Sequence, residues 1–198
     1  MTPKQAERLT QKISAIRRTL AAEKKRFGWY DDSRGLRYLP TRYYVQLGEF
    51  KDGLSYTRWF SKNFPDDVGF PDFLFEWTLL LFQNAKLKEA EQKAVETFCA
   101  DRQLFDHFLT RPVAPAEPWE ETPLPTASYA TYFASLGQPI GLEKFAQWLA
   151  AFLSTERFLV RAAQYQHLHR QLHTEQDAEK RQALVSQLQQ VTYAPFLS

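Results

Sequence analysis

The residues whose types and spacing come closest to metal chemistry are three histidines near the C-terminus, His167, His169 and His173. His169 and His173 are four positions apart, so on a helix their imidazoles share one face and can reach one ion. No third ligand follows at a spacing known for zinc sites, and the glutamate of a metalloprotease helix is missing. We therefore predict no metal site here, with metal binding by His169 and His173 kept open as the alternative.

No other segment has the spacing that enzyme chemistry requires. A glycine-rich phosphate loop, a nucleophile elbow and a paired-carboxylate pattern are all missing from the sequence. The single cysteine, Cys99, lies in an apolar helical stretch, where a small buried residue is expected rather than a nucleophile. The sequence therefore predicts a protein that is not an enzyme and needs no cofactor.

The composition favours an ordered helical protein in a reducing compartment. Apolar residues make up 44% of the 198 positions and aromatic residues 15%, which is enough for a sizeable core. Few stretches alternate Val, Ile and Thr with polar residues, so helix is expected rather than strand. One cysteine cannot form an internal disulfide, and the N-terminal stretch lacks the apolar core of a signal peptide. We expect a cytoplasmic location.

The formal charge of +2 is unevenly distributed along the chain. Residues 1–29 hold eight Lys or Arg and two Glu, a balance of +6, so the rest of the chain carries −4. A helix from Thr2 to about Arg26 would place Leu9, Ile13, Ile16 and Leu20 in one apolar stripe, with the basic residues mostly off it. A solvated face is the expected role of these charges. The alternative is a nucleic-acid patch that also uses Trp29, Tyr30, Arg34 and Arg37.

The stretch from Phe70 to Phe82, FPDFLFEWTLLLF, is predicted to be the buried centre of the fold. Nine of its thirteen residues are large and apolar, and they occupy every side of a helix rather than one stripe. The stretch is far shorter than the roughly 20 residues that cross a bilayer. Pro71 suits a first helical turn, where its missing N–H is not needed.

Helices are predicted on both sides of this central one. A helix from Thr41 to Leu47 begins near Pro40, because a proline further inside would break it. The next runs from Lys51 to Asn63 and places Gly53, Tyr56, Phe60 and Phe64 on one face. The helix after the centre reaches about Cys99, with Leu87, Ala90, Ala94, Thr97 and Phe98 facing inward and with Lys93 and Glu96 among its solvent-facing residues.

The second half of the chain is predicted to be a separate helical unit. A short apolar piece at 104–109 is followed by an extended connector, 111–126, which contains five prolines and no helical period. Helices are then expected at 128–136, 142–153, 155–173 and 178–191, the last two as an antiparallel pair. The domain division is therefore 1–110, the connector 111–126, and a C-terminal bundle 127–198 that packs on or caps the first part.

The segment 47–67, LGEFKDGLSYTRWFSKNFPDD, resembles the second half of a tetratricopeptide (TPR) repeat. In that family a Leu-Gly-acidic-aromatic turn leads to a helix that ends at a proline about seventeen residues on, as Gly48 and Pro65 do here. Gly53 matches the small residue at which two helices touch, and Ala90, 37 positions later, matches it in a second copy, close to the family period of 34. The resemblance covers about residues 34–101.

The resemblance implies an all-α fold of TPR-like hairpin repeats with extra N- and C-terminal helices. Such repeats usually serve as scaffolds that bind a peptide or a segment of a partner protein. The implied groove would be lined by Tyr38, Arg42, Val45 and Gln46 from the first copy and by Asp72, Phe75, Leu79 and Phe82 from the second. The alternative is that the C-terminal helices cover these eight residues and make them part of the core.

Overall fold

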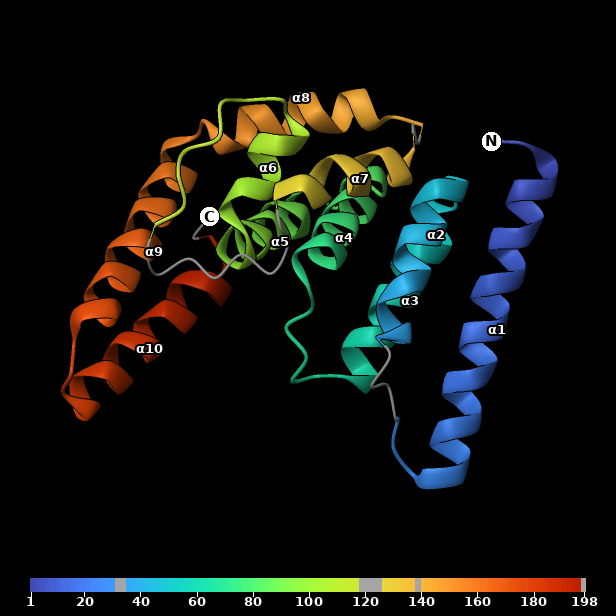
Figure 1. Ribbon diagram of the computed structural model, residues 1–198, viewed down its shortest axis with the longest axis horizontal. Coiled ribbons are helices and arrows are strands. Elements are labelled where there is room, and N and C mark those ends of the chain that lie inside the picture. The colour runs from blue at the N-terminus through green and yellow to red at the C-terminus, as the bar shows by residue number, and fades with distance from the viewer. Residues whose placement is uncertain (31–34, 118–125, 138–139, 197–198) are drawn as a thin grey trace.

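The computed structural model describes residues 1–30, 35–117, 126–137 and 140–196, and within these the chain forms α-helices and no strand (Figure 1). The all-α fold class is thus confirmed. The predicted helix boundaries hold to within about two residues for most elements. The elements are α1 (Pro3–Phe27), a 3₁₀ turn (Leu36–Tyr38), α2 (Leu39–Leu47), α3 (Phe50–Asn63), α4 (Pro71–Gln83), α5 (Leu87–Ala100), α6 (Arg102–Phe108), α7 (Thr126–Leu136), α8 (Leu142–Leu153), α9 (Glu156–Thr174) and α10 (Ala178–Tyr193).

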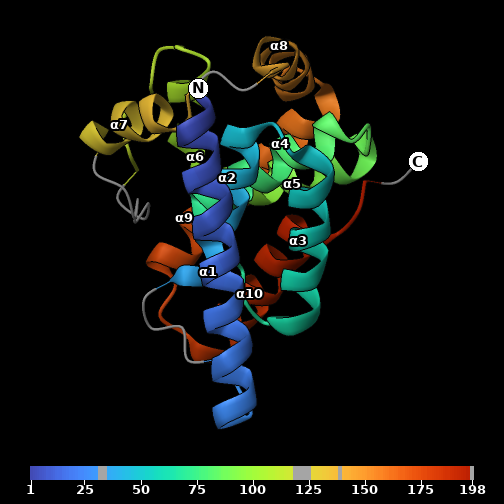
Figure 2. The ribbon, with the colours of Figure 1, turned by 90° about the vertical axis from the view of Figure 1, so that its right-hand side faces the viewer.

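Helix α1 begins at a capping box and lies along one side of the molecule. The Thr2 side chain accepts a hydrogen bond from the backbone of Gln5, whose own side chain accepts one from the Thr2 backbone. Ile13, Ile16 and Leu20 of the predicted stripe are buried, whereas Leu9, its first residue, is only partly buried. Figures 1 and 2 both show the C-terminal end of α1 projecting past the helices on which it packs.

Helices α2 and α3 form an antiparallel pair joined at Gly48, whose φ of +74° suits a residue without Cβ. Two contacts show that the pair is antiparallel. Tyr44 near the end of α2 lies against Gly53 near the start of α3, and Tyr38, before α2, lies against Phe60 near the end of α3. A Cβ added to Gly53 would lie 2.6 Å from Leu80 Cδ2 of α4. The predicted close helix contact at Gly53 is thus confirmed, and it involves three helices rather than two.

Helix α4 is the buried centre of the fold, as its composition predicts. Phe75, Leu79 and Leu80 are fully buried, and the main core extends from them to α5, α6, α7 and α8. Its partner α5 is antiparallel, since Leu81 shares a cluster with Ala90 while Thr78 Oγ1 lies 3.2 Å from Thr97 Oγ1. All residues of α4 are buried except Asp72, Trp77, Phe82 and Gln83, which are partly buried.

The C-terminal helices cover one side of these hairpins and then turn back as a projecting pair. Helices α6, α7 and α8 lie over α4 and α5, and α9 and α10 form the predicted antiparallel hairpin that extends away from them (Figure 1). Within the described residues no helix combines the length and the apolar composition needed to span a bilayer.

Two sequence predictions about this part of the chain need correction or restriction. Leu87 was expected to face inward, but it is 46% exposed because it begins α5 at the turn after Asn84. The connector 111–126 is described only up to residue 117, and 118–125 lie outside the described residues. Its described part has no helix and is held by hydrogen bonds from Arg102 to Pro115 O and from Gln103 to Ala114 O.

Candidate functional site

The predicted groove residues Arg42 and Asp72 belong to a charged cluster between α2 and α4. The Arg42 guanidinium donates to Glu76 Oε1 at 2.8 Å through Nε and to the Asp72 carboxylate through its terminal amine. Glu76 is only 1% exposed and also accepts a hydrogen bond from Thr41 at 2.8 Å. Burial raises the pKa of the Glu76 carboxyl to about 7, although the Arg42 charge acts in the opposite direction.

Tyr132 of α7 closes this cluster from outside. Its ring lies under the Arg42 guanidinium, 4.8 Å from ring centroid to Cζ, and its hydroxyl lies 3.3 Å from both Glu76 Oε1 and the Asp72 carbonyl. Burial raises the pKa of Tyr132 well above its usual value, so its hydroxyl is a donor. The cluster is thus filled by the protein itself and anchors α7 to α2 and α4.

The apolar part of the predicted groove lies beneath the C-terminal helices. Phe75 and Leu79 are both 0% exposed, and Phe75 contacts rings of α6, α7 and α8. The alternative reading of these positions, that C-terminal helices cover them, describes this structure. A partner could reach Phe75 and Leu79 only if α7 and α8 moved away.

The remaining predicted groove residues are also engaged within the protein. The side-chain amide of Gln46 donates to Ser135 O at the end of α7. The Tyr38 hydroxyl binds the Asp67 carboxylate at 2.8 Å and accepts from Arg37 at 2.9 Å, so it ties the start of α2 to the α3–α4 connection. Val45 is fully buried, and Phe82 packs on Trp148 of α8. Each of the eight predicted groove residues is thus buried or engaged by another part of the protein.

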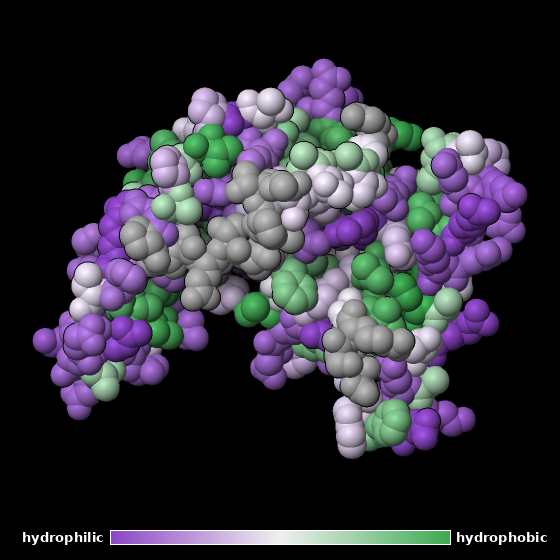
Figure 3. Space-filling model, viewed as in Figure 1, coloured by the Kyte–Doolittle hydropathy of each residue, from purple (hydrophilic) through white to green (hydrophobic). Residues whose placement is uncertain are grey.

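An open cleft lies on the other side of the hairpins, and we call it the interhelical cleft. Its volume is about 700 Å³, and it is bounded by the end of α3, the α3–α4 connection, α4, α5 and α10. Figure 3 shows the molecule hollowed between the α9–α10 hairpin and the α3–α4 connection. The cleft is defined here by Phe64, Val68, Trp77, Lys93, Glu96 and Tyr193.

The interhelical cleft combines apolar rims with a charged floor. Val68 is 66% exposed on one rim and Tyr193 is 49% exposed on the other. On the floor, Lys93 Nζ lies 4.0 Å from the centroid of the Trp77 ring and forms an ion pair with Glu96. The Lys93 and Glu96 side chains are only 15% and 14% exposed, so both charges are partly desolvated. This surface offers aromatic faces and one opposed charge pair to a ligand.

Sequence reasoning missed the interhelical cleft because it treated Lys93 and Glu96 as solvent-facing residues. Their spacing of three positions is typical of an exposed helical ion pair. What encloses them is α10, from nearly one hundred residues away, with Gln189 and Tyr193 on the opposite wall. Trp77 gives no local signal of the cleft, because it shares its side of α4 with Phe73, whose ring it contacts.

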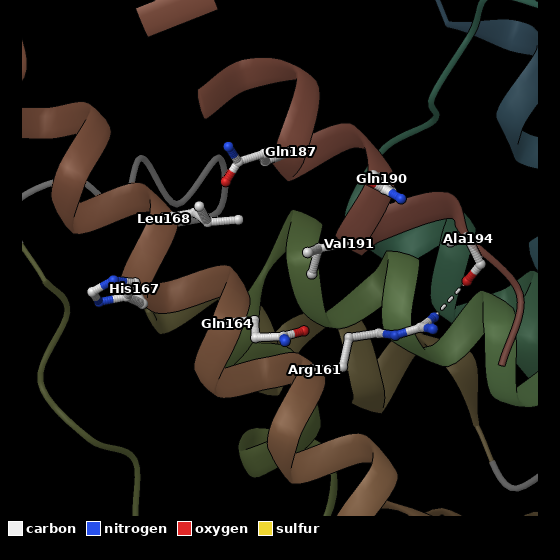
Figure 4. Close-up of a pocket in the computed structure, with 8 residues that line it drawn as sticks. All are labelled: Arg161, Gln164, His167, Leu168, Gln187, Gln190, Val191 and Ala194. Carbon is white, nitrogen blue, oxygen red and sulfur yellow. Dashed lines mark hydrogen bonds between the residues drawn. The ribbon is translucent and has the colours of Figure 1, made fainter. Parts of the chain in front are cut away.

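A second cleft, of about 500 Å³, lies between α9 and α10 and includes His167 (Figure 4). Its most polar residue, Arg161, donates to Ala194 O at 2.6 Å, and its guanidinium lies 3.9 Å from the Phe196 ring centroid. Arg161 therefore holds the C-terminal segment. Within the described part of the chain no group of three or more His, Cys, Asp or Glu side chains is placed to hold a metal ion, and His169 instead packs on Tyr165.

Other side chains that could take part in chemistry are buried within the protein. Tyr129, fully buried, donates to the Asp101 carboxylate, and the His107 imidazole stacks on the Tyr129 ring with centroids 4.1 Å apart. These contacts fasten α7 to α6. Burial raises the pKa of the Cys99 thiol to about 12, which keeps it protonated and unreactive at neutral pH.

Neither protein-family models, nor curated proteins, nor solved structures provide a match to this chain. The geometry described above is therefore the basis for a functional assignment.

Proposed function

We propose that the protein is a non-catalytic interaction scaffold that binds an extended segment of a partner protein in the interhelical cleft. The observation that carries the proposal is the cleft itself, about 700 Å³ and open to solvent, whose lining includes Trp77 and the exposed side chains of Val68 and Tyr193. Aromatic side chains that are partly exposed in a concave site are typical anchors for a partner's apolar residues.

The arrangement of α2 to α5 supports this proposal. Gly53 of the first antiparallel hairpin lies against Leu80 of the second, and Ala90 of the second shares a buried cluster with Leu54 of the first; the TPR-like resemblance assigns small residues to Gly53 and Ala90. Scaffolds built from such hairpins bind peptides along the stacked helices. In a TPR-like reading the binding surface belongs to the first helices, but here that side is covered by α7 and α8. We place the ligand on the side formed by the second helices, α3 and α5.

The charges of the cleft suggest how a segment would be oriented. Lys93 and Glu96 already pair with each other, and Asp67 pairs with Arg37. The exposed Asp66 on the rim has no partner among the described residues. A segment with apolar anchors and a flanking cation would place the anchors near Trp77 and the cation near Asp66.

The single cysteine fits a reducing, cytoplasmic setting, which we keep as part of the proposal.

The test uses a displayed library of random 15-residue peptides selected on the whole protein. Binding of the selected peptides is then measured calorimetrically to the wild type and to Val68→Glu/Tyr193→Glu. The matched control is Leu159→Glu/Val160→Glu on α9, because these side chains are 53% and 50% exposed and lie outside the cleft. We expect at least a tenfold loss of affinity in the cleft variant and less than a twofold change in the control.

Melting temperatures show whether each variant remains folded. All four replaced side chains are substantially exposed, so we expect shifts of only a few degrees. If no peptide is selected, or if both double variants lose affinity equally, the cleft is not a binding site and the proposal fails.

A further inference from the structure

The outward side of α1 carries a row of unpaired cations. All eight Lys and Arg side chains of residues 1–29 are exposed, and none forms an ion pair with a described acidic residue. At 100° per residue, five of them point away from the buried stripe of Ile13, Ile16 and Leu20. We call these five the cationic face: Lys4, Arg8, Arg18, Lys25 and Arg26.

The dimensions of the cationic face suit an extended polyanion. With a rise of about 1.5 Å per residue, Lys4 and Arg26 are separated by about 33 Å along the helix. Figure 2 shows α1 uncovered along its outer side, with its C-terminal end clear of the other helices. A charged row of this length can contact several successive phosphates of one nucleic-acid strand.

Two aromatic residues stand at the end of this row. Phe27 is 40% exposed and Trp29 is 64% exposed, and their ring centroids are 6.1 Å apart. The Arg26 guanidinium lies 4.9 Å from the Phe27 ring centroid. Exposed aromatic rings next to cations are the elements that stack unpaired bases in proteins that bind single strands.

The same residues argue against a membrane surface as the partner. A helix that lies in a lipid interface inserts its apolar side, but the apolar stripe of α1 is buried against the protein, with Ile13 in one cluster with Tyr44 and Tyr56. Between the cations the outward side carries small or polar residues, Glu7, Gln11, Ala15 and Ala22, and the Glu7 carboxylate accepts a hydrogen bond from the Gln11 side chain. Such a side can bind phosphate by charge, and Phe27 and Trp29 at its C-terminal end are its large apolar side chains.

We propose that the cationic face of α1 binds the phosphate backbone of a single-stranded nucleic acid, with a base stacked on Trp29. The proposal is independent of the interhelical cleft, which lies on other helices.

Two residues that the sequence suggested for a nucleic-acid patch have structural roles instead. Arg37 pairs with Asp67 at 2.6 Å, and the Tyr30 hydroxyl donates to Asn63 at 2.8 Å. Arg34 lies outside the described residues.

The experiment measures binding of a fluorescein-labelled, mixed-sequence single-stranded 20-mer by anisotropy over a series of salt concentrations. The test variant is Arg18→Glu/Lys25→Glu/Arg26→Glu. The control, Lys51→Glu/Lys62→Glu/Lys88→Glu, changes the net charge equally at exposed lysines on α3 and α5. We expect the wild-type affinity to fall steeply with salt. The test variant should bind at least tenfold more weakly with a log–log salt slope lower by about 2, since each single-strand contact contributes about 0.7.

Trp29→Ala separates stacking from charge. It should weaken binding about fivefold or more while leaving the salt slope unchanged. Circular dichroism and melting temperature verify that each variant is folded; should the triple variant unfold, Lys25→Gln and Arg26→Gln are measured singly, with a lower salt slope expected for each.

Three results would overturn the proposal. They are no binding of the 20-mer at low salt, an equal loss in the test and control variants, or α1-dependent binding to phosphatidylserine vesicles that matches or exceeds binding to the 20-mer. The last result would assign the cationic face to a membrane surface.

Discussion

Replacing Gly53 by alanine tests the close helix contact at the centre of the hairpins. Alanine is favoured over glycine inside a helix by about 1 kcal/mol, so helix propensity alone predicts a more stable protein. In the structure, however, the new Cβ would lie 2.6 Å from Leu80 Cδ2 and 3.0 Å from Tyr44 Cβ. Leu80 is fully buried and Tyr44 Cβ is fixed to the α2 backbone, so neither neighbour can simply turn away.

Overpacking of this kind costs about 1–3 kcal/mol, which exceeds the gain in propensity. We therefore expect Gly53→Ala to lower the free energy of unfolding by up to about 2 kcal/mol, and Gly53→Leu to prevent stable folding. The measurement is urea denaturation at 25 °C, with Ser55→Ala as the control because Ser55 is exposed on the same helix. A Gly53→Ala protein more stable than the wild type would refute the close contact.

Two further predictions concern α4. Because burial raises the pKa of Glu76 from 4.5 to about 7, its stabilising contribution is complete below pH 4.5 and is lost as the pH rises through 7. The free energy of unfolding of the wild type, compared with that of Glu76→Gln, should thus fall by up to about 3 kcal/mol between pH 4.5 and pH 8. Urea denaturation of both proteins at each pH measures this difference. A difference that stays constant with pH would contradict the prediction. Trp77→Ala should lower the free energy of unfolding by about 2–3 kcal/mol. This loss is smaller than for a fully enclosed aromatic residue, because Trp77 lines the cleft. A loss above about 4 kcal/mol would place Trp77 in the closed core.

The local part of the fold was predictable because its signals lie within single helices. Pro40, Gly48 and Pro65 mark where chain segments begin and end, and the all-round apolar composition of α4 identifies the centre. Gly53 was recognisable as a contact residue because its spacing from Gly48 and Pro65 matches a repeat pattern.

The relative placement of the helices was not predictable in the same way. Arg42 and Phe75 sit where a repeat groove would be, but whether they face solvent depends on α7, whose Tyr132 contacts Arg42 from ninety positions away. Likewise, the burial of Lys93 depends on α10. No periodicity within one segment reports which distant helix will cover it, so the sequence pointed to the covered side of the hairpins and missed the open one.

Hydrogen–deuterium exchange of the whole protein, with and without a peptide selected on it, tests the central claim of a binding cleft most directly. We predict new protection in residues 61–68 and 186–193, which form two walls of the interhelical cleft, and no change in residues 39–47 and 126–136, where α7 covers the first helices. Val68→Glu/Tyr193→Glu should abolish that protection. Protection confined to 39–47 and 126–136, or no protection at all, would contradict the assignment of the ligand to the cleft.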